Sequence, residues 1–181
     1  MRVITGTARG RKLREPANMD IRPTTDQVKE ALFNIVQWDL EGRRVLDLFS
    51  GTGQLGVEAL SRGAAYCLFL DESKQAVDII TDNVERCGFK NCRILRTDSL
   101  GYLRSGEKFD LIFIDPPYGK GLEQKALELI EEFDILNPGG IMVVETRRET
   151  PSPSFSAGYG TAREYVYGKI KLTVITRGVE K

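Results

Sequence analysis

The 181-residue sequence has no histidine, few cysteines and no long apolar segment. Its three cysteines, Cys67, Cys87 and Cys92, form no Cys-x-x-Cys pair, so a Cys/His zinc site lacks ligands and we expect no metal. No run approaches the roughly 18 apolar residues that cross a membrane, and residues 1–6 lack the apolar stretch of a signal peptide. We therefore expect a soluble, cytoplasmic protein with free thiols and no membrane partner.

The net charge is zero, but the charges are distributed unevenly along the chain. Residues 1–29 hold seven basic and three acidic side chains, so the remainder is acidic overall. A basic segment of this kind can bind nucleic-acid phosphates, although an ordinary solvated edge has the same composition. Its first 14 residues contain no acidic side chain and five basic ones: Arg2, Arg9, Arg11, Lys12 and Arg14.

Apolar strands alternate with amphipathic helices from residue 45 onward. This alternation predicts an α/β fold of the Rossmann-like, doubly wound type, with a mostly parallel sheet, and the length suits one domain over residues 1–181. We expect strands at 45–49, 67–70, 92–95, 109–114 and 141–144, the last after a break at 137–140. We expect helices at 24–36, 55–60, 76–84 and 122–130.

The two ends of the chain depart from the alternation. Residues 1–22 predict short extended pieces around a turn, before a core domain over 23–181. Thr24 with Gln27 has the pattern of a capping box, which starts a helix. Residues 150–161 predict a mobile loop. Beyond them, 164–176 predict a closing antiparallel hairpin around Gly168-Lys169.

A glycine-rich motif, Gly51-Thr52-Gly53-Gln54-Leu55-Gly56, directly follows the first strand of the alternation and opens a helix. With Asp71 twenty residues after Gly51, it matches the dinucleotide fingerprint of NAD enzymes. Asp47, four residues before Gly51, favours a different cofactor, because a carboxylate repels pyrophosphate and attracts the sulfonium and ammonium groups of S-adenosylmethionine. The motif therefore predicts an S-adenosylmethionine site.

Further residues complete this predicted cofactor site. Asp71 is expected to accept hydrogen bonds from the ribose hydroxyls, and Asp98 from the adenine amino group, although each has an alternative role as a helix cap or a solvated strand end. The expected cofactor-binding residues in the loop and at the later strand ends are Asp47, Phe49, Ser50, Gly51, Gly53, Asp71, Asp98 and Ser99.

The most specific segment is Asp115-Pro116-Pro117-Tyr118, at the end of the strand over 109–114. The two prolines fix an extended turn, which keeps the carbonyl of Pro116 out of a helix. Asp115 and that carbonyl can accept from the two N–H bonds of an exocyclic base amine, and Tyr118 can stack on the base. These four residues are therefore predicted to be catalytic in methylation of a base amine that is unpaired or flipped out.

The motif leaves alternatives open. No cysteine lies beside it, which disfavours carbon methylation through a cysteine adduct. A DNA methyltransferase acting on adenine N6 or cytosine N4 shares the motif, but only the N-terminal hairpin and the 150–161 loop remain for target recognition. A non-catalytic RNA-binding module with the same fold is a third interpretation.

The chain resembles the bacterial 16S ribosomal RNA guanine-(N2)-methyltransferase family (RsmD-like) over nearly its whole length. The resemblance rests on residues 4–13, on 22–34, on 47–53 and on 115–118. Ala8 stands where the family commonly has a larger residue, which bears on how the hairpin holds RNA. Asp71 stands where the family usually has glutamate.

This resemblance implies a seven-stranded sheet and methylation of a guanine N2 in 16S rRNA, within an assembled or assembling small ribosomal subunit. It implies that a basic N-terminal hairpin contacts RNA, with Arg22 added to the five basic residues of the first 14. It also places Arg22, Thr24 and Thr25 near the methionine end of the cofactor.

Overall fold

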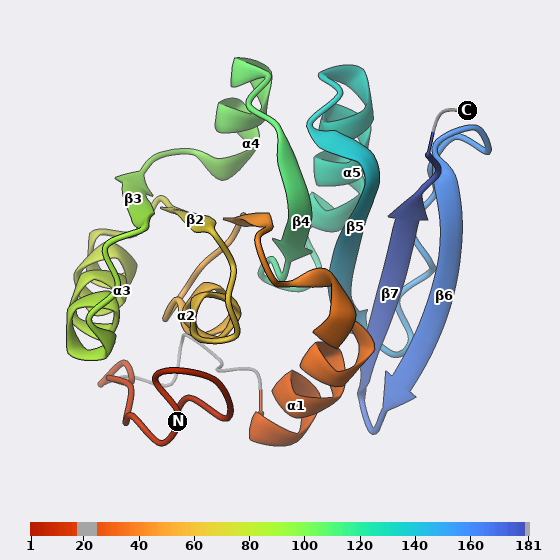
Figure 1. Ribbon diagram of the computed structural model, residues 1–181. Helices are drawn as coiled ribbons and strands as arrows, with labels where there is room; N and C mark the ends of the chain where they lie inside the picture. The colour runs from red at the N-terminus through yellow and green to blue at the C-terminus, as the bar shows by residue number, and fades with distance from the viewer. Residues whose placement is uncertain (18–24, 180–181) are drawn as a thin grey trace.

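The computed structural model describes residues 1–17 and 25–179 (Figure 1). Within these residues, one mixed sheet of seven strands has the order β3-β2-β1-β4-β5-β7-β6. The first five strands in this order are parallel, and β7 and β6 are antiparallel. The strands are β1 (Arg44–Asp47), β2 (Tyr66–Asp71), β3 (Cys92–Arg96), β4 (Phe109–Ile114), β5 (Leu136–Arg147), β6 (Gly160–Tyr167) and β7 (Ile170–Arg177). The predicted fold class and the C-terminal hairpin are confirmed.

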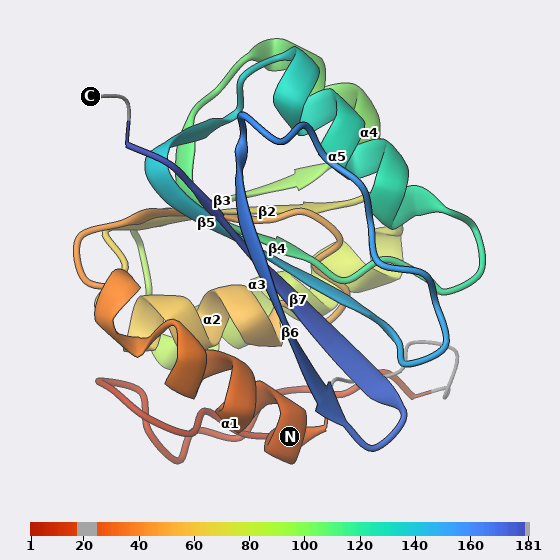
Figure 2. The same ribbon diagram turned by 90° about the vertical axis from the view of Figure 1, so that its right-hand side faces the viewer.

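Helices cover both faces of the sheet (Figure 2). The helices are α1 (Asp26–Ile35), α2 (Gln54–Ser61), α3 (Lys74–Cys87), α4 (Ser99–Tyr102) and α5 (Leu122–Glu132), with short 3-10 turns η1 (Gln37–Asp39) and η2 (Leu103–Ser105). The N-terminal segment, α1, α2 and α3 pack on one face, and α4 and α5 on the other. Because each face is covered, the central strands are apolar on both sides.

The predicted starts of α1 and β5 are wrong. The cap of α1 is Thr25, whose hydroxyl accepts from the Val28 N–H, one residue later than the predicted capping box, and Thr24 lies outside the described residues. Strand β5 begins at Leu136, so residues 137–140 do not break the chain before it. Gly139 adopts a positive φ of 73°, and the register between β4 and β5 shifts at this point, so the irregularity is absorbed within the strand.

The N-terminal segment is held by one antiparallel bridge, Arg2 with Lys12, and by flanking backbone hydrogen bonds. Ala8 is buried, with its N–H donating to the Ser61 hydroxyl (3.0 Å). The side chain of Ala8 therefore faces the protein core, and its small size bears on docking against α2 rather than on contact with RNA.

The predicted mobile loop is a loop over residues 150–159, but it is anchored to α5. The Ser154 N–H donates to Gln124 (2.9 Å), and the Ser156 N–H donates to Glu131 (2.8 Å). Phe155 also packs against the core on the α5 side.

Among the described residues, no helix has the length and apolar character needed to cross a membrane.

Candidate active site

A cavity of about 780 Å³ lies at the carboxyl ends of the parallel strands. This is the edge at which open α/β sheets bind ligands, and the volume suits a small organic ligand. The cavity brings together Thr25 and most of the predicted site: Asp47, Phe49, Ser50, Gly51, Asp71, Asp98, Ser99, Asp115, Pro116, Pro117 and Tyr118.

The glycine-rich loop is built by its own backbone. Gly51 and Gly53 have positive φ values of 55° and 75°, which glycine adopts without a side-chain penalty. The Ser50 hydroxyl donates to the Asp47 carbonyl (2.7 Å) and accepts from the Leu70 N–H (3.0 Å), which ties the ends of β1 and β2 together. Gly53 does not line the cavity. It is the N-cap residue of α2, and a Cβ at this position would come within 3.1 Å of the Ile80 side chain.

Asp47 is buried at the end of β1, and its carboxylate accepts from the Gly56 N–H (3.1 Å). Burial raises the pKa of Asp47 to about 7, the Gly56 N–H lowers it, and the nearby Asp71 carboxylate raises it further. A carboxyl group with a raised pKa on a cavity wall gains most from a cationic ligand, because a cation stabilises its ionised form.

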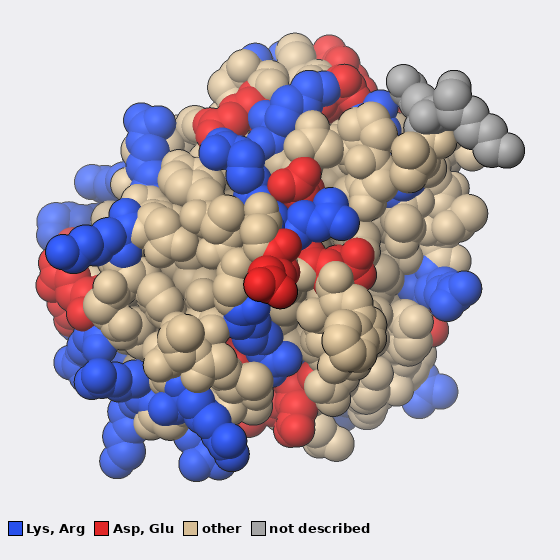
Figure 3. All heavy atoms as spheres, in the orientation of Figure 1, with Lys and Arg blue, Asp and Glu red and all other residues tan. Residues whose placement is uncertain are grey.

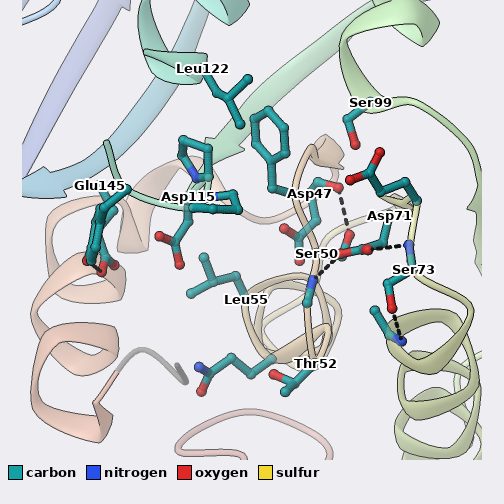
Figure 4. A pocket seen from close by; sticks show the side chains of 18 of the residues that line it. Asp47, Ser50, Thr52, Leu55, Asp71, Ser73, Ser99, Asp115, Leu122 and Glu145 are labelled. Carbon is teal, nitrogen blue, oxygen red and sulfur yellow. Dashed lines mark hydrogen bonds between the residues drawn. The ribbon is translucent and has the colours of Figure 1, made fainter. Parts of the chain in front are cut away.

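Asp71 and Asp98 combine structural and cavity-lining positions. Both oxygens of Asp71 accept backbone N–H groups, from Gly51 (2.9 Å) and Ser73 (2.9 Å), as the dashed lines in Figure 4 show. Burial raises the pKa of Asp71. Asp98 caps α4 by accepting from the Leu100 N–H (3.1 Å), so the alternative role considered for it is present while it also lines the cavity.

The segment from Asp115 to Tyr118 leaves β4 without helical structure, and α5 starts only at Leu122. Asp115 and Tyr118 are half-buried, while Pro116 is buried. The Tyr118 hydroxyl donates to Glu145 Oε1 (3.0 Å), and the Arg147 guanidinium lies 5.1 Å from the centre of the Tyr118 ring. The aromatic ring is therefore fixed by two residues of β5.

The cavity lining is acidic on one side and mixed in charge on the other, where Asp115 and Glu145 lie with the basic residues. The part formed by β1, β2 and β3 is acidic, with Asp47, Asp71 and Asp98, and it fits a cationic, hydroxyl-bearing ligand better than a pyrophosphate. Among the described lining residues the basic ones, Lys120 and Arg147, come from beyond β4. The acidic part and the Asp115–Tyr118 part open into the same space, so a cofactor and a base can meet there.

Comparison with known proteins identifies the family of the chain. The chain matches the family described as Conserved hypothetical protein 95 over residues 1–176. The chain belongs to this family. The chain is also 38% identical to the putative rRNA methyltransferase YlbH of Bacillus subtilis (strain 168), covering 93% of this chain and 94% of that protein.

A second relative, the ribosomal RNA small subunit methyltransferase D of Escherichia coli (strain K12), is 32% identical over 98% of this chain and 90% of its own length. Among solved structures, the putative methyltransferase yhhF from Escherichia coli superposes with a TM-score of 0.90 at 30% identity, covering 99% of both chains. The chain thus aligns with each of these three proteins over at least 90% of that protein's length.

Five of the basic residues predicted to bind RNA lie outside the cavity lining. Lys and Arg side chains gather over the N-terminal segment and α3, at the lower left of Figure 3. Arg14 forms an ion pair with Asp82 of α3, and Arg22 lies outside the described residues. The exposed basic residues of the segment are Arg2, Arg9, Arg11, Lys12 and Arg14.

Among the lining residues that the sequence did not predict are two charged residues of β5, Glu145 and Arg147. They follow the apolar run of β5 and belong to no motif that was recognised. The sequence did contain a signal for them, because charged residues at the carboxyl end of a buried parallel strand lie at the same edge of the sheet as the other strand ends.

Within the described residues, no cluster of three or more His, Cys, Asp or Glu side chains is placed to hold a metal ion.

Proposed function

We propose that the protein is an S-adenosylmethionine-dependent methyltransferase of EC class 2.1.1 that modifies a guanine N2 amine of 16S rRNA, in the cytoplasm. The observation that carries this proposal is the single cavity shared by the acidic ends of β1 to β3 and the Asp115-Pro116-Pro117-Tyr118 turn. When bound, S-adenosylmethionine supplies an electrophilic methyl group. Asp47, Asp71 and Asp98 would hold its cationic, ribose and adenine parts, and Thr25 would lie near its methionine end.

The catalytic turn acts on the base amine. Asp115 and the Pro116 carbonyl accept hydrogen bonds from the two amine hydrogens, which localises electron density on a nitrogen whose lone pair is otherwise delocalised into the ring. Pro117 keeps the turn extended, and Tyr118 stacks on the base and fixes its plane. Positioning and electrostatics supply the catalysis, and the proton leaves to Asp115 or water, so the absence of histidine is no obstacle.

Two observations support an RNA substrate. Two relatives are named as rRNA methyltransferases, and the N-terminal segment of this chain is basic and exposed. Arg2, Arg9, Arg11, Lys12 and Arg14 would contact phosphates beside the target, with Arg22 continuing the same surface. We propose the assembled or assembling small subunit as the substrate particle, and one methyltransferase domain over residues 1–181.

A methyl-transfer assay tests the function directly. Small subunits that lack the modification are mixed with the protein and S-adenosylmethionine, and the rRNA is mapped by mass spectrometry. One added methyl group on a single guanine N2 is expected. Transfer to adenine N6 or cytosine N4 of duplex DNA in preference to ribosomal particles would instead establish a DNA methyltransferase, and no product on any rRNA would refute the substrate.

The same assay tests the role of Asp115. Asp115→Ala is expected to lower the transfer rate by about 1,000-fold, because the amine loses its charged acceptor. Asp78→Ala on the exposed face of α3 serves as the control and should keep the rate unchanged. Binding of S-adenosylhomocysteine and the thermal transition should be the same in all three proteins. A near-normal rate for Asp115→Ala would refute the proposed mechanism.

A further inference from the structure

We propose that Glu145 determines specificity for guanine, by accepting a hydrogen bond from the N1–H of the target base next to the amine that Asp115 holds. This inference rests on the proposed function. It concerns the N1–H of guanine, a part of the base edge that the catalytic turn does not contact. It places the recognition of guanine on β5, outside the Asp115–Tyr118 motif.

The sheet register brings Glu145 and Asp115 together. Ile114 of β4 pairs with Val144 of β5 in parallel register, so the next residues, Asp115 and Glu145, leave neighbouring strands at the same level. Side chains alternate along a strand, and Phe113 and Val143, two positions earlier, both lie in the core on the α1 side. Asp115 and Glu145 therefore share this face, and both side chains line the cavity (Figure 4).

Glu145 is held rigidly where a base would lie. Its side chain belongs to a residue with only 5% exposure, and the Tyr118 hydroxyl donates to its Oε1 (3.0 Å). The Arg147 guanidinium, 5.1 Å from the Tyr118 ring centre, braces the ring from the same strand. Because Tyr118 is the proposed stacking surface, the plane of the base and the acceptor at its edge are fixed relative to one another. A carboxylate can accept further hydrogen bonds beside the one from Tyr118.

The donor pattern of guanine matches two neighbouring acceptors. On its Watson–Crick edge guanine presents the N1–H beside the N2 amine, whereas adenine N1 and cytosine N3 are acceptors beside their amines. A flipped base is recognised through this edge. With Asp115 on the amine, a carboxylate at Glu145 attracts guanine and repels the ring nitrogen of the other two amino bases. A site built to hydrogen-bond one group rejects analogues that lack it.

A base analogue separates recognition from a structural role. 2-Aminopurine keeps the 2-amino group but has an acceptor at N1. Small subunits are reconstituted with guanosine or 2-aminopurine at the mapped position, and single-turnover rates are measured for the wild type, Glu145→Gln, Tyr118→Phe and Glu149→Gln. Glu149 is an exposed neighbour just after β5, so its variant controls for loss of a negative charge.

The wild type and Glu149→Gln are expected to prefer guanine by roughly 100-fold. Glu145→Gln should lose about that factor on guanine and remove or invert the preference, because the glutamine amide can donate to N1 of 2-aminopurine. Tyr118→Phe should slow both substrates with the preference unchanged. Binding of S-adenosylhomocysteine by calorimetry and the thermal transition should stay at wild-type values in Glu145→Gln.

Each other outcome decides against the inference. If the wild type methylates guanine but Glu145→Gln keeps the wild-type preference, or behaves like Tyr118→Phe, Glu145 only positions Tyr118 and the inference alone is overturned. Loss of S-adenosylhomocysteine binding in Glu145→Gln would likewise assign it a structural role. If the wild type methylates no guanine, the proposed function fails and this inference fails with it.

Discussion

The glycine-rich loop and the N-terminal segment lie on the same side of the sheet, but different kinds of contact hold them in place. In the loop, the Gly53 N–H donates to the Ser50 carbonyl (2.7 Å) and the Ser50 hydroxyl donates to the Asp47 carbonyl (2.7 Å), and most of the other hydrogen bonds of the loop span 20 residues or fewer. In the N-terminal segment, the N–H groups of Ile4 and Thr5 donate to the Glu58 carboxylate at 2.8 and 3.0 Å, across more than 50 residues of chain. Local motifs can therefore specify the first region but not the second.

Buried polar side chains of α2 and α3 hold the N-terminal segment. Ser61 donates to the Thr5 carbonyl (2.6 Å) and accepts from the Ala8 N–H. Asn83, fully buried on α3, accepts from the Arg14 N–H (2.6 Å) and donates to the Thr52 carbonyl in the cofactor loop (2.9 Å). One side chain thus connects the end of the basic segment with the loop, and the two regions are fixed relative to each other.

The largest effect is expected from Glu58→Gln. Glu58 and Lys29 are both fully buried, with Lys29 Nζ 3.8 Å from the carboxylate, and burial lowers the pKa of Lys29. Removing the negative charge leaves the buried lysine with only the more exposed Asp26 carboxylate, also 3.8 Å away, at a cost of about 3 kcal/mol in the free energy of unfolding, measured with urea. The exposed control Glu85→Gln should change it little, and Lys29→Met with Glu58→Gln should recover part of the loss. An equal loss of unfolding free energy in Glu58→Gln and in the control Glu85→Gln would contradict this account.

A pair of glycine substitutions isolates the docking of the N-terminal segment. Gly6 and Gly10 both have positive φ, 88° and 80°, so alanine is strained at either position. At Gly6 a Cβ would also lie 1.8 Å from the Ser61 carbonyl oxygen, whereas at Gly10 no described atom is within 4 Å. Gly10→Ala should cost about 1 kcal/mol and Gly6→Ala about 2–3 kcal/mol. Trypsin cleavage at the exposed Arg9 and Arg11 should accelerate only in Gly6→Ala, and equal acceleration in both would show that α2 does not hold the segment.

A pH titration tests the effect of the buried Asp47, beside the glycine-rich loop, on the stability of the protein. Burial raises the pKa of Asp47 from 3.8 to about 7, so between about pH 4 and 7 the folded protein keeps a proton that the unfolded chain releases. The contribution of Asp47 to stability is therefore lost as the pH rises, with a slope of up to about 1.4 kcal/mol per pH unit, and it levels off above pH 7. Asp47→Asn should remove this slope between pH 5 and 7 in urea unfolding, while the exposed control Asp78→Asn keeps it.

The cofactor should reverse this pH dependence. A cationic ligand favours the ionised form of Asp47, so the affinity for S-adenosylmethionine is expected to increase as the pH rises to about 7. Calorimetry in buffers of different ionisation enthalpy would detect the released proton. Parallel pH profiles for the wild type and Asp47→Asn would contradict the assignment.

The sequence by itself determined the order of the strands and of the four longer helices, the glycine-rich loop and the Asp115–Tyr118 turn. Apolar periodicity, the φ freedom of glycine and the rigidity of proline act within a few residues, so a linear pattern expresses them. The sequence did not show that Asp98 both caps α4 and lines the cavity, that Gly53 lies outside the cavity lining, or that β5 starts at Leu136. Each of these depends on contacts with parts of the chain that are distant in sequence.

Only the tertiary structure decided what lies beside the catalytic turn and what holds the basic segment. Glu145 lies level with Asp115 because β5 pairs with β4 in one register out of several that an apolar strand allows. Glu58, Ser61 and Asn83 are ordinary polar residues of amphipathic helices in the linear pattern, and they become anchors only when the N-terminal segment folds back on them. Contacts between distant residues depend on the packing of the whole chain, which no local pattern specifies.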